Sequence, residues 1–134
     1  MIGVLIVSHG DIGTSLLTSA SQILGEPPAQ VATLSVWRAD DVDDLVLRAR
    51  ELMEGLDSGD GVLVLTDIFG ATPGNVVSRL LQDGRIEGVS GVSLPMLLRV
   101  LTGRNGSIAA AVKRALSGGS EGLVHMNTDR CCDA

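Results

Sequence analysis

Residues 2–10 read IGVLIVSHG, and the first six of them set an architectural pattern that the rest of the chain repeats. Residues 2–7 are a short apolar run rich in β-branched side chains, which is typical of a parallel strand covered on both faces. Similar runs occur at residues 31–36, 61–65 and 86–92, and each is followed by a longer stretch with apolar residues at helical spacing. This alternation predicts repeated βα units.

The helical stretches are expected at residues 13–24, 40–56 and 73–81 and in a C-terminal group over residues 95–116. Apolar residues of the second stretch recur at three- and four-residue steps, so one face of this helix should lie on the sheet. Asp40 and Asp41 supply capping oxygens and negative charge at its start. Gly25, Gly59 and Gly84 are expected to end the helices that precede them.

Right-handed crossovers between such units give an α/β fold with three layers, in which a doubly wound, mostly parallel sheet has helices on both faces. A short run at residues 123–125 could add an edge strand or a strand exchanged with another chain. The sequence contains no linker, repeat or low-complexity segment, so we expect a single domain over residues 1–134. Ligands of such sheets bind beyond the carboxyl ends of the strands, where functional residues should therefore lie.

The charge balance narrows the class of partner. The chain has 10 Lys and Arg against 16 Asp and Glu, and a formal net charge of −6. Binding to nucleic acid depends on basic residues that replace counterions, so nucleic acid is not an expected partner. A protein partner should instead offer a basic or apolar face.

Aromatic residues make up 1% of the chain, namely Trp37 and Phe69, which leaves few platforms for stacking on sugars or bases.

Cysteine usage and the first residues of the chain indicate a cytoplasmic location. Cys131 and Cys132 are adjacent and near the end of the sequence, a placement that suits neither a disulfide framework nor a zinc site. Met1 leads directly into the first apolar run without a basic segment or a cleavage site, and no apolar run is long enough to cross a membrane. We therefore expect a cytoplasmic protein without membrane insertion.

His9 and Asp67 are the candidate catalytic pair. His9 directly follows the first predicted strand, and Asp67 follows the third. These strands are neighbours at the switch point of a doubly wound sheet, so the two side chains should come close together. A carboxylate bound to one ring nitrogen fixes the tautomer and leaves the other nitrogen free as a nucleophile, base or metal ligand. Taken singly, His9 equally suits a helix cap or a loop, and Asp67 a cap of the next helix.

Gly70, Ala71 and Thr72 are candidates for binding a phosphoryl group. Small residues let backbone N–H groups point inward, and Pro73 suits the first turn of a helix. Thr72 is expected as the N-cap, with a hydroxyl that could also reach a phosphoryl oxygen; the alternative is an ordinary Thr-Pro helix start. Neither a nucleotide-binding glycine motif nor a serine-nucleophile elbow is present. A neutral imidazole can accept a phosphoryl group without a metal ion or other cofactor.

Three segments, LIVSHG at residues 5–10, LTDIFGATPGN at 65–75 and GVSLPML at 91–97, resemble the mannose-family EIIA domain of the bacterial phosphoenolpyruvate:sugar phosphotransferase system (PTS). The resemblance implies that the phosphocarrier HPr phosphorylates His9, that Asp67 orients its ring, and that the group passes to a histidine of an EIIB protein. It also implies strand order 2-1-3-4 and a homodimer that exchanges an antiparallel edge strand, here residues 123–125.

The chain departs from the family pattern at two positions. Ala71 stands where a second glycine is common, which narrows the backbone approach, and Ser93 stands where Asn is common. The phosphotransfer subunit of dihydroxyacetone kinase also begins with a Ser-His strand end, but its second segment is less similar.

Three functions remain open. The first is a phosphocarrier component in sugar uptake. The second is a regulatory module whose phosphorylation state reports to a protein target. The third is a non-catalytic, anion-binding flavodoxin-like domain. Only phosphotransfer requires a reachable nitrogen on His9, which separates the third function from the others. The sequence separates neither the first two functions nor any sugar specificity.

Overall fold

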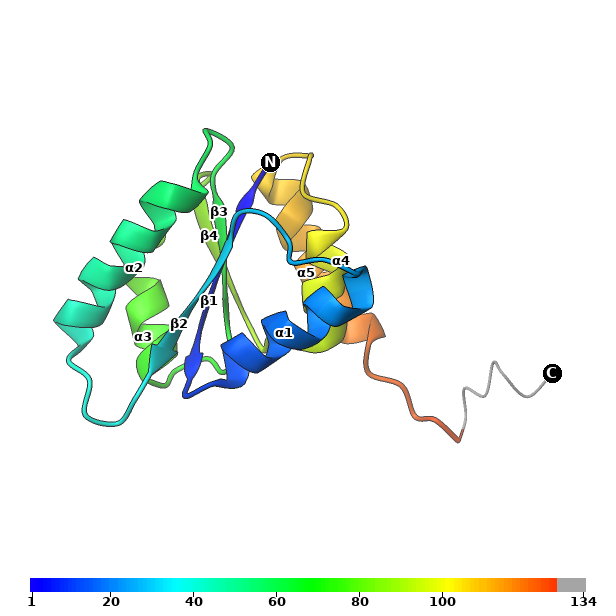
Figure 1. Cartoon of the computed structure of the whole chain (residues 1–134), viewed down its shortest axis with the longest axis horizontal. Coiled ribbons are helices and arrows are strands. Elements are labelled where there is room, and N and C mark those ends of the chain that lie inside the picture. Colours follow the sequence, from blue (N-terminus) through cyan, green and yellow to red (C-terminus); the bar gives the residue numbers. More distant parts are fainter. Residues whose placement is uncertain (128–134) are drawn as a thin grey trace.

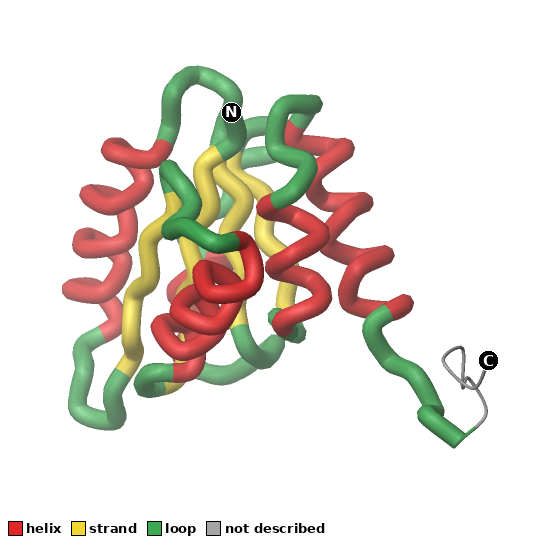
Figure 2. The backbone as a smooth tube through the Cα atoms, turned by 45° about the vertical axis from the view of Figure 1, so that its right-hand side comes forward, coloured by secondary structure: helices red, strands yellow, loops and turns green. Residues whose placement is uncertain are grey.

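A computed structural model of the chain describes residues 1–127, so Cys131 and Cys132 lie outside the described residues. Four parallel strands form one sheet in the order β2-β1-β3-β4, namely β1 (Gly3–His9), β2 (Val31–Val36), β3 (Val62–Thr66) and β4 (Ile86–Ser90). One face of the sheet is covered by α1 (Ile12–Leu24), α4 (Leu94–Leu101) and α5 (Ile108–Glu121), and the other by α2 (Val42–Leu56) and α3 (Thr72–Ser78) (Figure 1; Figure 2). The predicted three-layer α/β fold and strand order are confirmed.

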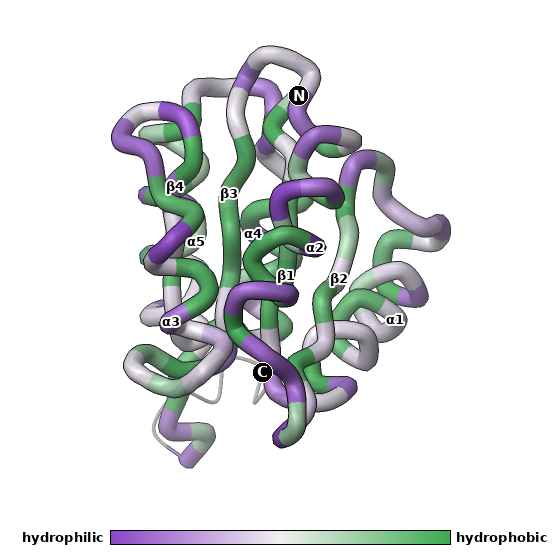
Figure 3. Tube along the Cα trace, turned by 90° about the vertical axis from the view of Figure 1, so that its left-hand side faces the viewer, coloured by the Kyte–Doolittle hydropathy of each residue, from purple (hydrophilic) through white to green (hydrophobic). Residues whose placement is uncertain are grey.

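The apolar strands are explained by burial on both faces. In β1, Leu5 and Val7 pack in the core beneath α2 and α3, whereas Val4 and Ile6 pack in the core beneath α1, α4 and α5. Successive strand residues point to opposite faces, so a strand between two helical layers must be apolar throughout. Figure 3 shows the same hydrophobic character along β3. No helix within residues 1–127 is both long and apolar enough to cross a membrane.

The helices differ from the sequence-based prediction in several details. The group predicted at residues 95–116 is two helices, and Ser107 begins the second by accepting a hydrogen bond from the Ala110 amide at 3.1 Å. Asp41 is the N-cap of α2, but its carboxylate makes no capping hydrogen bond. The Asp40 carboxylate accepts from the Trp37 amide at 2.8 Å instead. The predicted side-chain cap is therefore wrong, because Asp40 closes the preceding turn.

Of the three glycines predicted to end helices, one does so in the structure. Gly25 ends α1 in the left-handed region, with φ of 89°. Gly59 lies in the loop beyond the end of α2, whose C-cap is Asp57. α3 ends at Ser78, before the predicted residue 81, and Gly84 lies in the following turn.

Residues 123–125 form no strand within this chain. After α5 the described segment runs away from the body of the molecule as a loop (Figure 1). β4 lies at the edge of the sheet and has β3 as its strand neighbour. Exchange of this segment between two copies stays a prediction.

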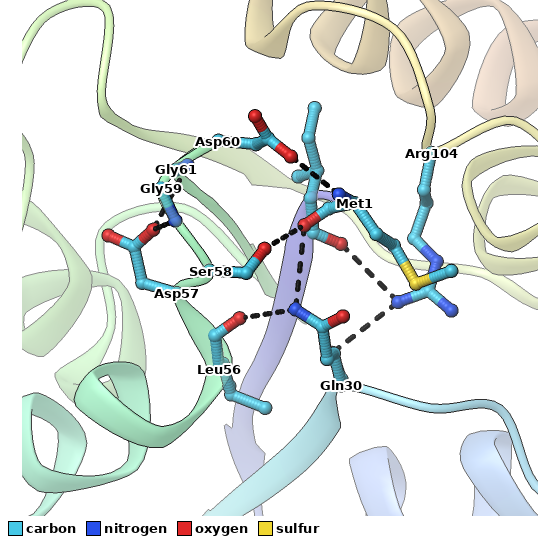
Figure 4. A network of polar contacts seen from close by, with 10 residues as sticks. Met1, Gln30, Leu56, Asp57, Ser58, Gly59, Asp60, Gly61 and Arg104 are labelled. Carbon is cyan, nitrogen blue, oxygen red and sulfur yellow. Dashed lines mark hydrogen bonds and ion pairs between the residues drawn. The ribbon is translucent and has the colours of Figure 1, made fainter.

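The amino ends of the strands are held by a polar network (Figure 4). Arg104 is 6% exposed, and its guanidinium donates to the carbonyls of Ile2 at 3.3 Å and Gln30 at 3.4 Å. The Gln30 side chain donates to the Leu56 carbonyl at 2.8 Å. Burial lowers the pKa of the Arg104 guanidinium. Side chains from distant parts of the sequence thus fasten the edge of the sheet opposite the strands' carboxyl ends.

Gly13→Ala is expected to destabilise the fold by about 1–3 kcal/mol, because the added methyl would overpack the interface between α1 and the sheet. A Cβ at Gly13 would lie 2.9 Å from Ile6 Cγ2 and 3.0 Å from Ser8 Oγ. Gly55 in α2 has no such neighbour within 4 Å, so Gly55→Ala should stabilise by about 0.5–1 kcal/mol through helix propensity. Urea unfolding measures both changes, and equal effects of the two substitutions would contradict the close packing at Gly13.

Candidate active site

His9 is the last residue of β1 and lies at the carboxyl edge of the sheet. Its side chain is 49% exposed, whereas the preceding Ser8 is buried and its hydroxyl accepts from the Gly13 amide at 2.8 Å. Strand alternation directs these neighbours to opposite faces. Ser8 and His9 therefore form no nucleophile–base pair.

The predicted contact between His9 and Asp67 is present. His9 Nδ1 lies 2.7 Å from Asp67 Oδ2, and the His9 amide donates to the same oxygen at 3.2 Å. The Thr66 hydroxyl donates to Oδ1 at 3.4 Å. The contact is consistent with the sheet, because Val7 of β1 pairs with Thr66 of β3, and His9, two residues beyond Val7, and Asp67, one residue beyond Thr66, follow that pair at the same edge.

The state of Asp67 determines the tautomer of His9. Burial of the carboxyl group, which is 12% exposed, raises its pKa, but the hydrogen bonds from His9 outweigh burial and leave the pKa of Asp67 below its usual value. The group is then an ionised acceptor at neutral pH, so Nδ1 of His9 must carry the proton. In the neutral ring the lone pair is then on Nε2, which has no hydrogen-bond partner within residues 1–127. A half-exposed ring with a free nitrogen can act as a nucleophile.

The depressed pKa of Asp67 predicts a pH-dependent contribution to stability. A group whose pKa falls on folding stabilises the protein above its unfolded value, about 3.9 for Asp, and loses that contribution as the pH falls through its folded pKa. The difference in unfolding free energy between wild type and Asp67→Asn should therefore shrink as the pH falls below about 5 and on through the lowered folded pKa of Asp67. Urea titrations at several pH values measure it. Asp83→Asn, at an exposed position in the turn before β4, is the control, and a constant difference for Asp67→Asn would contradict the prediction.

The loop after Asp67 carries the predicted phosphoryl-binding residues. Gly70 adopts φ of 91°, in the left-handed region, and a Cβ at Gly74 would lie 3.1 Å from the Ile68 carbonyl, so the loop folds closely over the start of α3. Ala71, rather than Thr72, is the N-cap, and it makes no side-chain capping bond. The predicted cap at Thr72 is wrong, because Thr72 has already entered the helix and Ala71 provides the first carbonyl acceptor, for the Asn75 amide.

Ser93 and Trp37 are two further residues that lie after strands. Ser93 caps α4, with Oγ accepting from the Met96 amide at 3.3 Å. Trp37, which the sequence analysis did not connect with the site, lies against the turn after His9: a Cβ at Gly10 would be 3.3 Å from Trp37 Cζ3. The signal available was an aromatic residue directly after the second strand. No group of three His, Cys, Asp or Glu side chains in the described part of the chain is placed to hold a metal ion.

Comparisons with known proteins point to one family. The family model EIIA-man, described as PTS system fructose IIA component, matches residues 3–116. The PTS system fructose-specific EIIA component of Bacillus subtilis (strain 168) is 33% identical over 103 residues, which are 76% of this chain and 70% of that protein. The PTS system mannose-specific EIIAB component of Escherichia coli (strain K12) is 31% identical over 125 residues, which are 91% of this chain.

The chain spans 38% of the length of the Escherichia coli protein. Among solved structures, the phosphotransferase system component EIIA from Streptococcus agalactiae superimposes with a TM-score of 0.85 and 28% identity, covering 96% of this chain and all of that one. Since the family model matches most of the sequence and the fold agrees, the chain belongs to the mannose/fructose EIIA family of the bacterial phosphotransferase system.

Proposed function

We propose that this chain is a cytoplasmic phosphocarrier that accepts a phosphoryl group from phospho-HPr on Nε2 of His9 and passes it to a histidine of an EIIB protein during sugar uptake. The observation that carries the proposal is the half-exposed imidazole of His9, whose Nδ1 is held by Asp67 at 2.7 Å while Nε2 remains open. Membership of the EIIA family supports it. A non-catalytic anion site would not need this arrangement.

The transfer requires few changes in bonding. The lone pair of His9 Nε2 forms a bond to phosphorus as the bond from phosphorus to the donor's ring nitrogen breaks, and that electron pair returns to the donor imidazole. The His9 ring gains positive charge, which the Asp67 carboxylate stabilises through the hydrogen bond at Nδ1. No proton has to leave His9 for the bond to form. Asp67 therefore acts by orienting the ring and stabilising its charge.

The loop at Gly70, Ala71 and Thr72 would bind the phosphoryl oxygens. Its backbone amides and the Thr72 hydroxyl are hydrogen-bond donors of the kind that stabilise charge spread over a transferring phosphoryl group. The left-handed conformation of Gly70 supports this role, because it lets the chain turn tightly just after Asp67. The methyl group of Ala71 limits how closely the backbone approaches the phosphoryl group.

Thr72→Ala is expected to slow transfer by about 3- to 10-fold, because one hydrogen bond to the phosphoryl group is worth about 0.5–1.5 kcal/mol net. Thr72→Ser keeps the hydroxyl and should retain a rate near that of the wild type. Single-turnover phosphorylation by phospho-HPr compares the two variants. Equal slowing by both substitutions would assign Thr72 to the local fold of α3 instead.

A homodimer is part of the proposal. Residues 123–125 would pair with the β4 edge of a second copy, and the exposure of Leu123 and Val124 supports burial there on assembly. Light scattering at micromolar concentration should then give twice the mass of one chain. A monomer that still transfers phosphate would remove the exchanged strand from the proposal.

The phosphoryl relay tests the proposed function directly. Incubation with phosphoenolpyruvate, enzyme I and HPr should place an acid-labile phosphate on the chain, and peptide mapping should find it on His9. An EIIB protein of the mannose type should then discharge it. Label on any other residue would contradict the proposal. A labelled chain that EIIB proteins do not discharge would favour the regulatory module over the carrier.

A further inference from the structure

Thr66 is a buried polar residue at the end of an apolar strand. β3 reads VLVLT from Val62 to Thr66, and all five of its residues are buried. Within residues 1–127 the other buried polar or charged side chains are those of Ser8 and Arg104. A hydroxyl that is withdrawn from water costs free energy unless it finds a hydrogen-bond partner. Val has nearly the same shape and would avoid that cost, which suggests that the hydroxyl of Thr66 has a role.

The partner of this hydroxyl is the carboxylate of Asp67. Thr66 Oγ1 donates to Oδ1 at 3.4 Å, whereas Oδ2 accepts from the amide of His9 at 3.2 Å and lies 2.7 Å from His9 Nδ1. The torsion that rotates a carboxylate about its Cβ–Cγ bond has broad energy minima. A contact at Oδ1 therefore restricts the rotation that would carry Oδ2 away from Nδ1.

Thr66 is itself held firmly by the sheet. Its strand lies between β1 and β4, and Thr66 pairs with Val7 on one side and with Ser90 on the other. Its carbonyl accepts from the Val92 amide at 3.0 Å. The β-branched side chain has few rotamers, and it is 3% exposed. Asp67 lies one residue beyond the end of the strand, so the hydroxyl of Thr66 provides a fixed point for a side chain that begins in a loop.

We propose that Thr66 is a positioning residue for phosphoryl transfer, which acts by holding the Asp67 carboxylate in the orientation that fixes the His9 ring. The inference rests on the proposed function and adds a residue to it. Because Thr66 is buried, it does not meet the donor protein. Loss of its hydroxyl therefore slows the chemical step and leaves the KM for the donor unchanged.

Thr66→Val tests the role of the hydroxyl, because it keeps the branched shape of the side chain. Thr66 lines a cavity of about 120 Å³ together with residues that include Gly74 and Val77 of α3, and a smaller residue would enlarge it. The variant should lower kcat for phosphorylation by phospho-HPr by about 2- to 10-fold, which corresponds to one hydrogen bond. Its KM should stay close to that of the wild type. Thr66→Ser keeps the hydroxyl and should recover most of the rate.

Thr33→Val is the matched control, because it makes the same change in β2. The Thr33 hydroxyl lies 3.2 Å from the Thr14 hydroxyl and has no hydrogen bond to Asp67. Its kcat should equal that of the wild type. Urea unfolding checks that each variant is folded.

A double-mutant cycle tests whether Thr66 acts through Asp67. Asp67→Ala has no carboxylate to orient, so the addition of Thr66→Val should cause no further loss of rate, whereas independent effects would add. Nitrogen NMR of the unphosphorylated chain gives a second readout. The fraction of neutral His9 rings that carry their proton on Nδ1 should fall in Thr66→Val and return in Thr66→Ser.

Several outcomes would overturn the inference. These are a wild-type kcat in Thr66→Val, a rise in KM alone, additive losses in the cycle, an unchanged tautomer fraction, or equal slowing by Thr33→Val. Absence of phosphate on His9 of the wild type would instead contradict the proposed function. The nitrogen NMR comparison involves no phosphoryl donor, so it tests the contact between Thr66 and Asp67 even in that case.

Discussion

His9→Ala is expected to abolish phosphorylation by phospho-HPr, lowering the rate on the order of a thousandfold or more, because removal of a nucleophile leaves no atom to accept the group. The fold should tolerate the change, since the side chain is half exposed and contributes little to the core. Radiolabel transfer from phosphoenolpyruvate through enzyme I and HPr measures the loss. Circular dichroism and urea unfolding check that the variant is folded.

His125→Ala is the matched control for this experiment, because His125 is the other histidine of the chain and lies beyond α5. Its labelling should equal that of the wild type. Full labelling of His9→Ala, or loss of label in His125→Ala alone, would move the phosphorylated residue away from β1. The acid lability of the label provides a further check, since phosphate on a carboxylate or hydroxyl group has a different stability profile from phosphohistidine.

Asp67→Ala should give the second largest effect, lowering the rate of transfer by about 10- to 100-fold. A hydrogen bond to a charged group contributes about 1.5–3 kcal/mol, and each 1.4 kcal/mol corresponds to a factor of about ten. The loss should appear in kcat, because Asp67 holds the ring at Nδ1 and stabilises its developing charge without meeting the donor protein. Rapid-quench measurements at saturating phospho-HPr determine kcat.

Asp67→Asn separates charge from hydrogen bonding. Its amide oxygen can still accept from Nδ1, so the ring keeps its tautomer, but the stabilising negative charge is lost. Its kcat should lie between those of Asp67→Ala and the wild type. Wild-type kcat in both variants would remove the orienting role. A rise in KM with unchanged kcat would instead indicate that Asp67 acts on docking.

Much of the fold follows from local patterns in the sequence. The strands were predictable because residues 4–7 and their counterparts must be apolar on both faces when helices cover both sides of the sheet. The proximity of His9 and Asp67 followed from the same architecture, since adjacent parallel strands end at one edge. The complete strand order, including the places of the two outer strands, came from the family resemblance, because periodicity does not specify it.

The errors lie where two local interactions compete for the same group. The Asp40 carboxylate can cap a helix or close a turn. In the structure it accepts a hydrogen bond from the Trp37 amide and so closes the turn. Thr72 could lie just before the helix or be its first residue. Pro73 fits the first turn of the helix in both cases. The position of the Trp37 ring over Gly10 is a contact between two loops, which no repeating pattern encodes. Pairing of residues 123–125 would involve a second chain.

The polar network of Arg104 and Gln30 lies at the opposite edge of the sheet from His9. The contacts that hold the strands together and the His9–Asp67 pair are thus separated by the full length of the sheet, so a substitution at one end leaves the hydrogen bonds at the other end in place.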